Sequence, residues 1–312
     1  MRVAVSGATG FIGRALVRTL LDRGDDVLAL SRRPEAARRI LGEEVKLIRW
    51  SPEFDPAWGE AIEGYDAVIN LAGEPIFGRR WTRAQKRRIL KSRAESAAGM
   101  IKAIRRADHR PDVLINASAI GYYGPQQDER IDESAPPGED FLAEVSRAWE
   151  EEVEDDDTEN VRTVRIRIGV ALGPGGGALK WMAAPFRMFL GGPIGSGRQW
   201  ISWIHIDDLV GIFLLALENP RVEGPLNATA PEPVTNREFA RTLGQVLGRP
   251  SWLPTPGIVL RLAFGQAADV IRQGQRVWPR RVLEMGYRFR FASLAEALQN
   301  ILRPAQTTRP SP

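Results

Sequence analysis

The stretch Ser6-Gly7-Ala8-Thr9-Gly10-Phe11-Ile12-Gly13 follows directly on a short apolar strand, Arg2 to Val5, and leads into an apolar-periodic helix from Arg14 to Asp22. Gly7 lets the backbone turn tightly, Gly10 lets a pyrophosphate approach the main chain, and Gly13 lets the helix pack close to the strand. The helix N-terminus offers free N–H groups to anionic oxygens. The stretch therefore predicts a dinucleotide-binding turn whose members include Thr9, Phe11 and Ile12 as well as the three glycines. An ordinary tight turn is the alternative.

The end of the second predicted strand indicates which dinucleotide binds. The apolar run from Asp26 to Leu30 ends where an acidic residue would hold the two ribose hydroxyls of NAD. The chain instead has Ser31, Arg32 and Arg33 there, a hydroxyl and two guanidinium groups that suit a 2′-phosphate through charge-assisted contacts. We therefore predict NADP(H) as the cofactor. The alternative is that the two arginines are solvated surface charges in an Arg-rich chain.

Strand-like and helix-like segments alternate along the first half of the chain. The strands are predicted at Val3 to Ser6, Val27 to Leu30, Val45 to Ile48, Ala67 to Leu71, Val113 to Ala117 and Val161 to Val170. The helices between them are predicted at Gly13 to Asp22, Pro34 to Leu41, Pro56 to Glu63, Thr82 to Ala107 and Phe141 to Val153. This alternation is typical of an α/β fold with a Rossmann-like doubly wound parallel sheet. The loops after the strands should line one crevice at their carboxyl ends.

The pattern changes at the glycine-rich segment 173–177, which begins an irregular half of the chain. We expect a Rossmann domain over residues 1–172 and a smaller mixed C-terminal lobe for substrate over 173–303, part of which returns to the sheet. Helices are expected to begin near Pro256 and Ser293. Residues 304–312 are polar and Pro-rich, and we expect a disordered tail there.

Composition excludes several classes of function. The 312 residues contain no cysteine and two histidines, which leaves no thiolate chemistry and little for a transition-metal site, so no metal is expected. No apolar run is long enough to cross a bilayer, and we expect a cytoplasmic protein without a membrane partner. The net charge is only +4 and basic residues are scattered, which argues against a nucleic-acid partner.

Longer phrases resemble the extended short-chain dehydrogenase/reductases. They are the glycine turn, Asn70-Leu71-Ala72-Gly73, Asn116-Ala117-Ser118-Ala119 with Tyr123-Gly124, Arg167-Ile168-Gly169 and His205-Ile206-Asp207-Asp208. More narrowly, the chain resembles the atypical, nucleoside-diphosphate-sugar epimerase-like members of that family, on the phrases Asn70 to Ile76, Ser118 to Gly124, Asp140 to Val145 with Trp149-Glu150, and Ser202 to His205. The resemblance extends to about Phe291. It places Leu71, Ala72, Gly73 and Glu74 beside the cofactor, although Glu74 before Pro75 also fits a loop turn.

The family's acid/base pair is missing. Short-chain dehydrogenases use a Tyr with a Lys four residues later, because the ammonium lowers the phenol pKa and holds the nicotinamide ribose. None of the four tyrosines has Lys at that spacing, and the equivalent positions are Phe141 and Val145. A phenyl ring cannot transfer a proton, so the usual mechanism does not apply.

Four residues are candidates for the missing chemistry. Ser118 matches the family's serine to within one residue, since a register shift would place Ala119 there. Tyr122 and Tyr123 follow the fifth strand, where either phenol would meet substrate, or where both would form a packing wall. His205 is the side chain best suited to proton transfer near neutral pH, or else a hydrogen-bonded anchor before a helix.

The segment from Gly195 to Trp203 offers side chains for an anionic or sugar-like substrate. By resemblance to the sugar-nucleotide enzymes, Arg198 and Gln199 would face substrate, together with Ser202 and Trp203. An aromatic-stiffened loop is the alternative.

Two functions follow. One is an NADP(H)-dependent oxidoreductase or epimerase-like enzyme that acts on a small polar, sugar-nucleotide-like molecule with a substituted acid/base. The other is a non-catalytic NADP(H)-binding sensor or interaction protein. A homodimer through the long helices is also open.

Overall fold

The computed structural model describes residues 1–76, 78–126, 128–154, 160–254 and 273–303. The strands are β1 (Arg2–Ser6), β2 (Asp26–Ser31), β3 (Lys46–Arg49), β4 (Ala67–Asn70), β5 (Val113–Ala119), β6 (Arg130–Ile131), β7 (Arg162–Ile168), β8 (Val170–Leu172), β9 (Trp200–Ile201), β10 (Trp203–His205), β11 (Gly224–Ala228), β12 (Val234–Thr235) and β13 (Arg276–Val277). The helices are α1 (Phe11–Asp22), α2 (Pro34–Leu41), α3 (Pro56–Ala61), α4 (Arg83–Arg106), the short 3-10 helix η1 (Ile120–Tyr123), α5 (Phe141–Glu151), α6 (Gly177–Arg187), α7 (Ile206–Glu218), α8 (Asn236–Leu247), α11 (Arg280–Glu284) and α12 (Leu294–Leu302).

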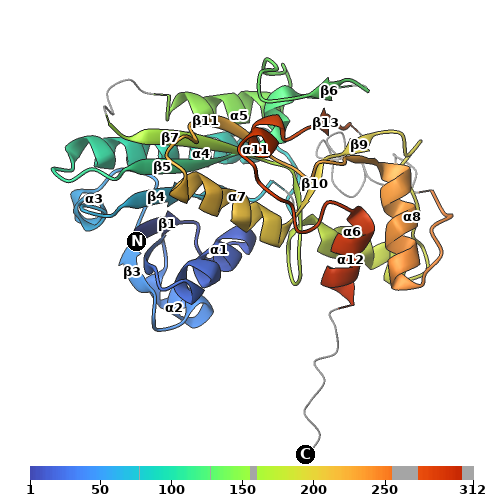
Figure 1. The fold of residues 1–312 in the computed structure, drawn as a ribbon, viewed down its shortest axis with the longest axis horizontal. Helices are drawn as coiled ribbons and strands as arrows, with labels where there is room; N and C mark the ends of the chain where they lie inside the picture. The colour runs from blue at the N-terminus through green and yellow to red at the C-terminus, as the bar shows by residue number, and fades with distance from the viewer. Residues whose placement is uncertain (77, 127, 155–159, 255–272, 304–312) are drawn as a thin grey trace, which may run out of the picture.

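A seven-stranded parallel sheet forms the centre of the molecule (Figure 1), in the order β11-β7-β5-β4-β1-β2-β3. The order reverses at β1, which pairs with β2 on one side and β4 on the other. Ser6 lies level with Leu30 and Asn70, and Asn70 lies level with Asn116, so these carboxyl ends meet at one edge. The predicted doubly wound Rossmann-like sheet is confirmed, and its switch point lies between β1 and β4.

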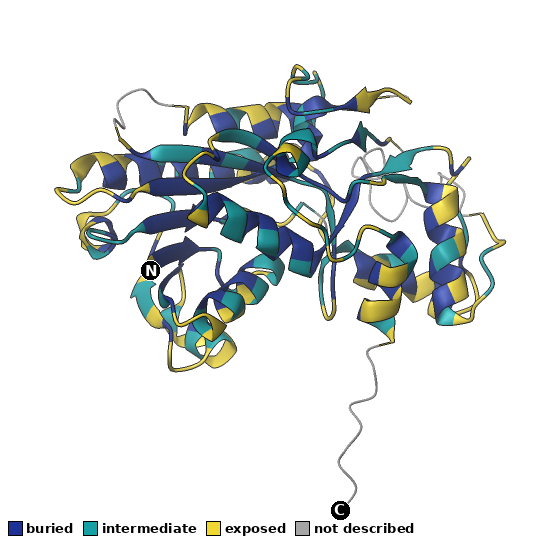
Figure 2. Ribbon diagram, in the orientation of Figure 1, coloured by how far each residue is buried: buried dark blue, intermediate teal, exposed yellow. Residues whose placement is uncertain are grey.

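Helices cover both faces of the sheet, and the strands are therefore apolar on both sides. One core joins the sheet to α1 and α7, and the other joins it to α3, α4 and Trp149 of α5. Figure 2 shows the central strands buried and the outer faces of the helices exposed. The long helix α4 begins where the Thr82 side chain accepts a hydrogen bond from the Gln85 N–H, and α5 begins where Asp140 accepts one from Ala143.

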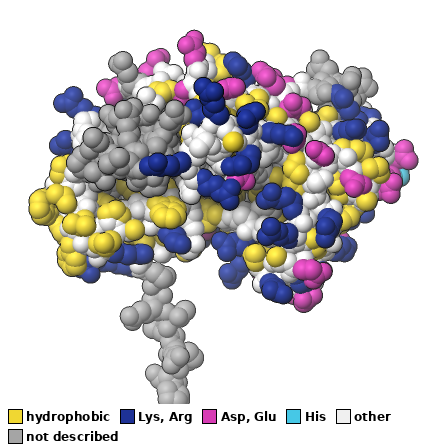
Figure 3. All heavy atoms as spheres, turned by 180° about the vertical axis from the view of Figure 1, so that it is seen from behind, with side chains coloured by type: hydrophobic (Ala, Val, Ile, Leu, Met, Phe, Trp, Pro, Cys, Tyr) yellow, Lys and Arg dark blue, Asp and Glu magenta, His cyan; other side chains and the backbone are white. Residues whose placement is uncertain are grey.

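A smaller lobe packs beside the carboxyl edge of the sheet (Figure 1), where α6, α8 and α12 surround Trp203 and Phe239. Residues 206–228 run back from it, because α7 packs on the sheet and β11 forms its outer strand. Seen from behind, hydrophobic side chains gather at the end that holds this lobe, while Lys and Arg elsewhere are interspersed with Asp and Glu (Figure 3). No helix in the described ranges has the length and apolar character needed to cross a bilayer.

One expected strand is divided. The sequence predicts a single strand from Val161 to Val170, but the structure ends β7 at Ile168 and turns β8 away to pair with β10. A Cβ on Gly169 would lie 2.5 Å from the carbonyl oxygen of Ser202, so only glycine allows the two backbones this close. The expected helix near Pro256 and the tail 304–312 lie outside the described residues.

Candidate functional site

The glycine turn is built from backbone contacts that leave no room for side chains. Gly7 has a φ of +68°, and a Cβ there would lie 2.7 Å from the carbonyl carbon of Leu71. A Cβ on Gly13 would lie 2.3 Å from the carbonyl oxygen of Gly7. The turn therefore packs tightly against both the loop after β4 and the first turn of α1.

The N-terminus of α1 is not capped by a side chain. Gly10 is the N-cap residue, and no side-chain oxygen of a described residue accepts a hydrogen bond from the first turn. These N–H groups therefore face outward with the positive end of the helix dipole, which suits a phosphate. The neighbouring Phe11 ring contacts the glycine-rich segment instead, since a Cβ on Gly176 would lie 2.4 Å from the ring.

Ser31, Arg32 and Arg33 lie at the carboxyl end of β2, as the sequence predicts. Both guanidinium side chains are exposed, and neither makes an ion pair with a residue that the structure describes. The Ser31 hydroxyl accepts a hydrogen bond of 3.2 Å from the N–H of Arg33 and thereby shapes the turn. Two free cations next to a hydroxyl suit an anionic group such as a 2′-phosphate.

Buried polar side chains fix the strand ends between β1 and β5. Ser6 Oγ donates to Asn70 Oδ1 at 2.6 Å, and Asn70 Nδ2 donates to Asn116 Oδ1 at 2.7 Å. Asn70 Oδ1 also accepts from the N–H of Ala72 at 3.3 Å. This ladder sets the path of the loop that follows β4, because each side chain is buried and bonded.

The loop Leu71-Ala72-Gly73-Glu74 lies against the glycine turn through Leu71. Gly73 is exposed, and the Glu74 carboxylate turns towards the start of α4. Its Oε1 lies 3.5 Å from Gln85 Nε2 on that helix and 3.8 Å from Nη1 of Arg79, which precedes the helix. The N–H of Glu74 donates to Ser92 Oγ at 3.0 Å. The backbone of this loop is therefore held by the long helix.

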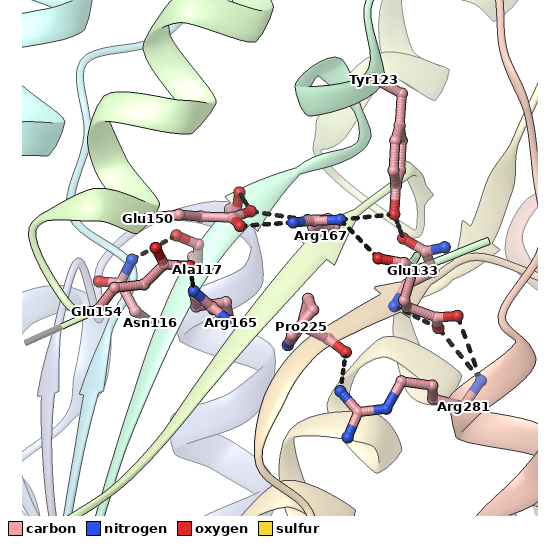
Figure 4. A network of polar contacts seen from close by, with 12 residues as sticks. Asn116, Ala117, Tyr123, Glu133, Glu150, Glu154, Arg165, Arg167, Pro225 and Arg281 are labelled. Carbon is pink, nitrogen blue, oxygen red and sulfur yellow. Dashed lines mark hydrogen bonds and ion pairs between the residues drawn. The ribbon is translucent and has the colours of Figure 1, made fainter. Parts of the chain in front are cut away.

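Ser118 takes part in a buried charge network that Figure 4 shows from close by. Its hydroxyl donates to Glu150 Oε1 at 2.6 Å, and the same carboxylate binds Arg167 through Nε at 2.9 Å and Nη2 at 2.8 Å. Burial lowers the pKa of Arg167, but the hydrogen bonds and charge of Glu150 outweigh it and raise the pKa above its ordinary value. In the sequence, Arg167 stands out only as part of the family phrase Arg167-Ile168-Gly169. No local pattern predicts its ion pair with Glu150, 17 positions away.

Tyr123 belongs to the same network (Figure 4). Its hydroxyl donates to Asn227 Oδ1 at 2.7 Å and accepts from Arg167 Nη1 at 2.9 Å. The side chain is fully buried, and this burial raises the pKa of Tyr123 to about 12 although Arg167 opposes the shift. The phenol is therefore neutral and bonded at neutral pH.

Glu133 closes the network at its far end and was not singled out in the sequence. Its carboxylate accepts from the N–H groups of Asn227 at 3.0 Å and Arg281 at 3.3 Å. Burial raises the pKa of Glu133, while these N–H groups act in the opposite direction. The network thus joins β5, α5, β7, β11 and the start of α11.

Tyr122 differs from its neighbour. It is half-buried, its ring packs edge-on against Tyr123, and Arg167 Cζ lies 3.5 Å from its centroid. Its hydroxyl makes no hydrogen bond to any residue in the described part of the chain. Among the four predicted acid/base residues, Tyr122 is thus the one whose polar group has no such partner.

His205 caps α7. Its Nδ1 accepts from the N–H of Asp207 at 3.1 Å, its Nε2 lies 3.2 Å from Asn300 Oδ1, and its ring stacks on Phe291 at 3.9 Å. The side chain is 1% exposed, and burial lowers the pKa of His205. Both nitrogens serve the fold, which matches the anchor alternative better than proton transfer.

The predicted substrate residues divide into two groups. Arg198 is exposed, and Gln199 is half-buried with Nε2 donating to the carbonyl of Ile194 at 3.1 Å. Ser202 and Trp203 are buried, and their polar atoms bond the carbonyls of Gln275 at 2.7 Å and Glu232 at 3.0 Å. The second pair supports the small lobe from inside.

The helix that would hold the family's acid/base pair is apolar at both positions. Phe141 packs on Trp81 with centroids 5.2 Å apart, and Val145 is buried in the same cluster. Across the described ranges, no three His, Asp or Glu side chains gather as metal ligands would.

Comparison with known proteins places these features among relatives. A model of the NAD dependent epimerase/dehydratase family matches residues 3–228, and a domain of unknown function (DUF1731) matches residues 255–301. The chain is 43% identical to the chloroplastic epimerase family protein SDR39U1 homolog of Arabidopsis thaliana, over 97% of this chain and 87% of that protein.

Two solved structures are also similar. The human epimerase family protein SDR39U1 (isoform 2) with NADPH superposes with a TM-score of 0.85 at 39% identity, covering 96% of this chain and 99% of that one. The nucleoside-diphosphate sugar epimerase of Corynebacterium glutamicum gives 0.77 at 30% identity, covering 97% and 58%.

Proposed function

The chain belongs to the NAD dependent epimerase/dehydratase family, and on this premise we propose that it binds NADP(H) across the carboxyl edge of its sheet. The observation that carries the proposal is the uncapped N-terminus of α1 beside Arg32 and Arg33, which make no ion pair with any described residue. The first suits the pyrophosphate and the second suits a 2′-phosphate. The human relative solved with NADPH supports the same cofactor.

The residues predicted to contact the cofactor have different roles in binding it. Thr9 and the N-cap Gly10 lead into α1, and Phe11, Ile12 and Gly13 form its first turn, where backbone N–H groups bind anionic oxygens. Gly7 lets that turn lie against Leu71, and the loop from Ala72 to Glu74 follows β4, on the other side of β1 from β2. We assign residues 1–172 to the cofactor domain and 173–303 mainly to a substrate lobe.

For the reaction, we assign the role of acid/base to Tyr122. NADP(H), when bound, supplies or accepts a hydride. Tyr122 lies just past β5 at the carboxyl edge, its hydroxyl has no partner among described residues, and Arg167 holds its ring. Ser118, Tyr123 and His205 have polar atoms already engaged, which makes each a weaker candidate. The substrate class is a small polar molecule of the sugar-nucleotide kind, bound with the help of Arg198 and Gln199.

A non-catalytic NADP(H)-binding protein is the second candidate. The observation that favours it is the apolar packing of Phe141 and Val145 where the family's Tyr and Lys would be. The substrate edge would then serve a sensor or an interaction.

Two measurements test these proposals. Calorimetric titration of nucleotide-free protein should show NADPH binding more tightly than NADH, and no binding of either would refute the cofactor. NADPH oxidation against a panel of UDP-sugars and small carbonyl compounds then tests the reaction. Tyr122→Phe should abolish any turnover found, while Tyr123→Phe, the matched control, should reduce it less. Equal turnover in Tyr122→Phe and wild type would refute the assignment, and no turnover on any compound would favour the sensor.

A further inference from the structure

Arg93 on α4 is a buried cation behind the loop that follows β4. Arg93 is 9% exposed, and its Nη1 donates to the carbonyl oxygens of Glu74 at 3.0 Å and Ile89 at 3.1 Å. The guanidinium carbon lies 5.0 Å from the centroid of Trp149 on α5. The side chain is therefore clamped between two helices and the loop.

Among the described residues, this cation has no carboxylate partner. No Asp or Glu in the described ranges lies within ion-pair distance of Arg93, whereas Arg167 is paired with Glu150. Burial lowers the pKa of Arg93 to about 10, with the charge of Glu74 acting in the opposite direction. An unpaired charge is costly to bury, and such groups gather at sites where a ligand completes them.

The flat face of the guanidinium lies against Gly73. A Cβ built on Gly73 would lie 3.0 Å from Cζ, 3.2 Å from Nη2 and 3.3 Å from Nε of Arg93. Nε and Nη2 donate to no described residue, and Gly73 is itself exposed. Two donor atoms without a described partner therefore lie beside the point where the loop backbone reaches the surface.

The order of the strands indicates which part of the dinucleotide meets this point. Arg32 and Arg33 follow β2, the glycine turn follows β1, and Gly73 follows β4 on the other side of β1. A dinucleotide with its 2′-phosphate at β2 and its pyrophosphate at α1 extends its remaining half over β4.

We propose that Arg93 binds the nicotinamide-ribose half of NADP(H), donating from Nε and Nη2 beside Gly73 to oxygens of that half. It is a cofactor-binding residue in addition to those predicted from the sequence. The proposal rests on the NADP(H) function proposed above.

Calorimetry with two ligands tests it. NADPH contains both halves, while adenosine 2′,5′-bisphosphate contains the 2′-phosphate but ends before the nicotinamide ribose. In Arg93→Met, the Kd for NADPH should rise about tenfold or more, because hydrogen bonds from a charged donor are lost, while the Kd for the bisphosphate should not change. Arg87→Met removes an exposed cation from the same helix and should change neither Kd.

The outcomes separate the two proposals. Suppose that wild type binds both ligands and that Arg93→Met leaves both Kd values unchanged or raises them by the same factor. Arg93 then does not bind the nicotinamide half, and the NADP(H) function stands. If wild type binds neither ligand, both proposals fall. Arg93→Lys guards against misfolding, because it keeps the cation. This variant should bind NADPH more tightly than Arg93→Met does. If both variants are folded, with matching melting curves, and lose the same affinity for NADPH, a role for the charge would be overturned.

Discussion

Changing Arg32 and Arg33 together to alanine should remove most of the selectivity for NADPH over NADH. Both side chains are exposed, and neither has an ion-pair partner in the described part of the chain. The fold should therefore lose little, because exposed substitutions without partners usually change stability by less than about 0.5 kcal/mol. The effect should be seen almost wholly in cofactor binding.

The expected size follows from the contacts that are lost. A hydrogen bond to a charged group contributes about 1.5–3 kcal/mol, and exposure to solvent places these two arginines at the lower end of that range. Two such contacts give about 3 kcal/mol, which is roughly a 100-fold rise in the Kd for NADPH. NADH has no 2′-phosphate, so its Kd should stay the same.

Calorimetric titration of wild type, the double variant and a control variant with NADPH and NADH measures the change in the two Kd values directly. Arg39→Ala is the matched control, since it removes an exposed charge from α2 without approaching the end of β2. In wild type, added salt should also weaken NADPH binding more than NADH binding, because exposed charges are screened. A double variant that keeps the wild-type ratio of the two Kd values would refute the role of the arginine pair.

Four further changes test other parts of the molecule. Glu150→Gln leaves its buried guanidinium partner without a counter-charge, so the free energy of unfolding in urea should fall by about 3–5 kcal/mol; a loss below about 1 kcal/mol would show that the pair matters little. His205→Asn keeps a cap acceptor that cannot be protonated. Burial lowers the pKa of His205, so as the pH falls this side chain is protonated in the unfolded chain before it is protonated in the folded protein. Wild type should therefore lose more stability than the variant between about pH 7 and about pH 5. Equal losses would contradict this. Gly13→Ala would place Cβ 2.3 Å from the Gly7 oxygen and should lower stability by about 1–3 kcal/mol together with NADPH affinity. Gly10→Ala meets that oxygen at 3.2 Å and should weaken NADPH binding with little change in Tm, so unchanged affinity there would argue against a close approach of phosphate.

The sequence was sufficient for features that depend on neighbours along the chain. The strand, glycine turn and helix at the N-terminus follow from local pattern and backbone sterics, and the observed α2 has the predicted bounds, Pro34–Leu41. The break between β7 and β8 could not be predicted in this way. It depends on how near Gly169 comes to Ser202, a contact between segments that only the folded chain brings together.

The same distinction applies to the site. Ser118 and Tyr123 were singled out because of their place after a strand, but what each hydroxyl can do depends on Glu150, Arg167 and Asn227, which are distant in sequence. No local pattern reports that a hydroxyl is already bonded. The role of these residues in catalysis stays a prediction, and the structure adds the reason to test Tyr122 before them.

The groups at the carboxyl edge are unequally divided between binding and chemistry. The features that suit a dinucleotide are several and independent: a helix N-terminus without a side-chain cap, the pair Arg32 and Arg33, and Arg93, which has no carboxylate partner in the described part of the chain. The proposed chemistry depends on the single hydroxyl of Tyr122. Loss of any one binding feature should therefore weaken the cofactor by a finite factor, whereas loss of that hydroxyl should remove turnover altogether. A cofactor affinity that survives Tyr122→Phe, beside a turnover that does not, is the pattern that separates an enzyme with a substituted acid/base from a protein that only binds NADP(H).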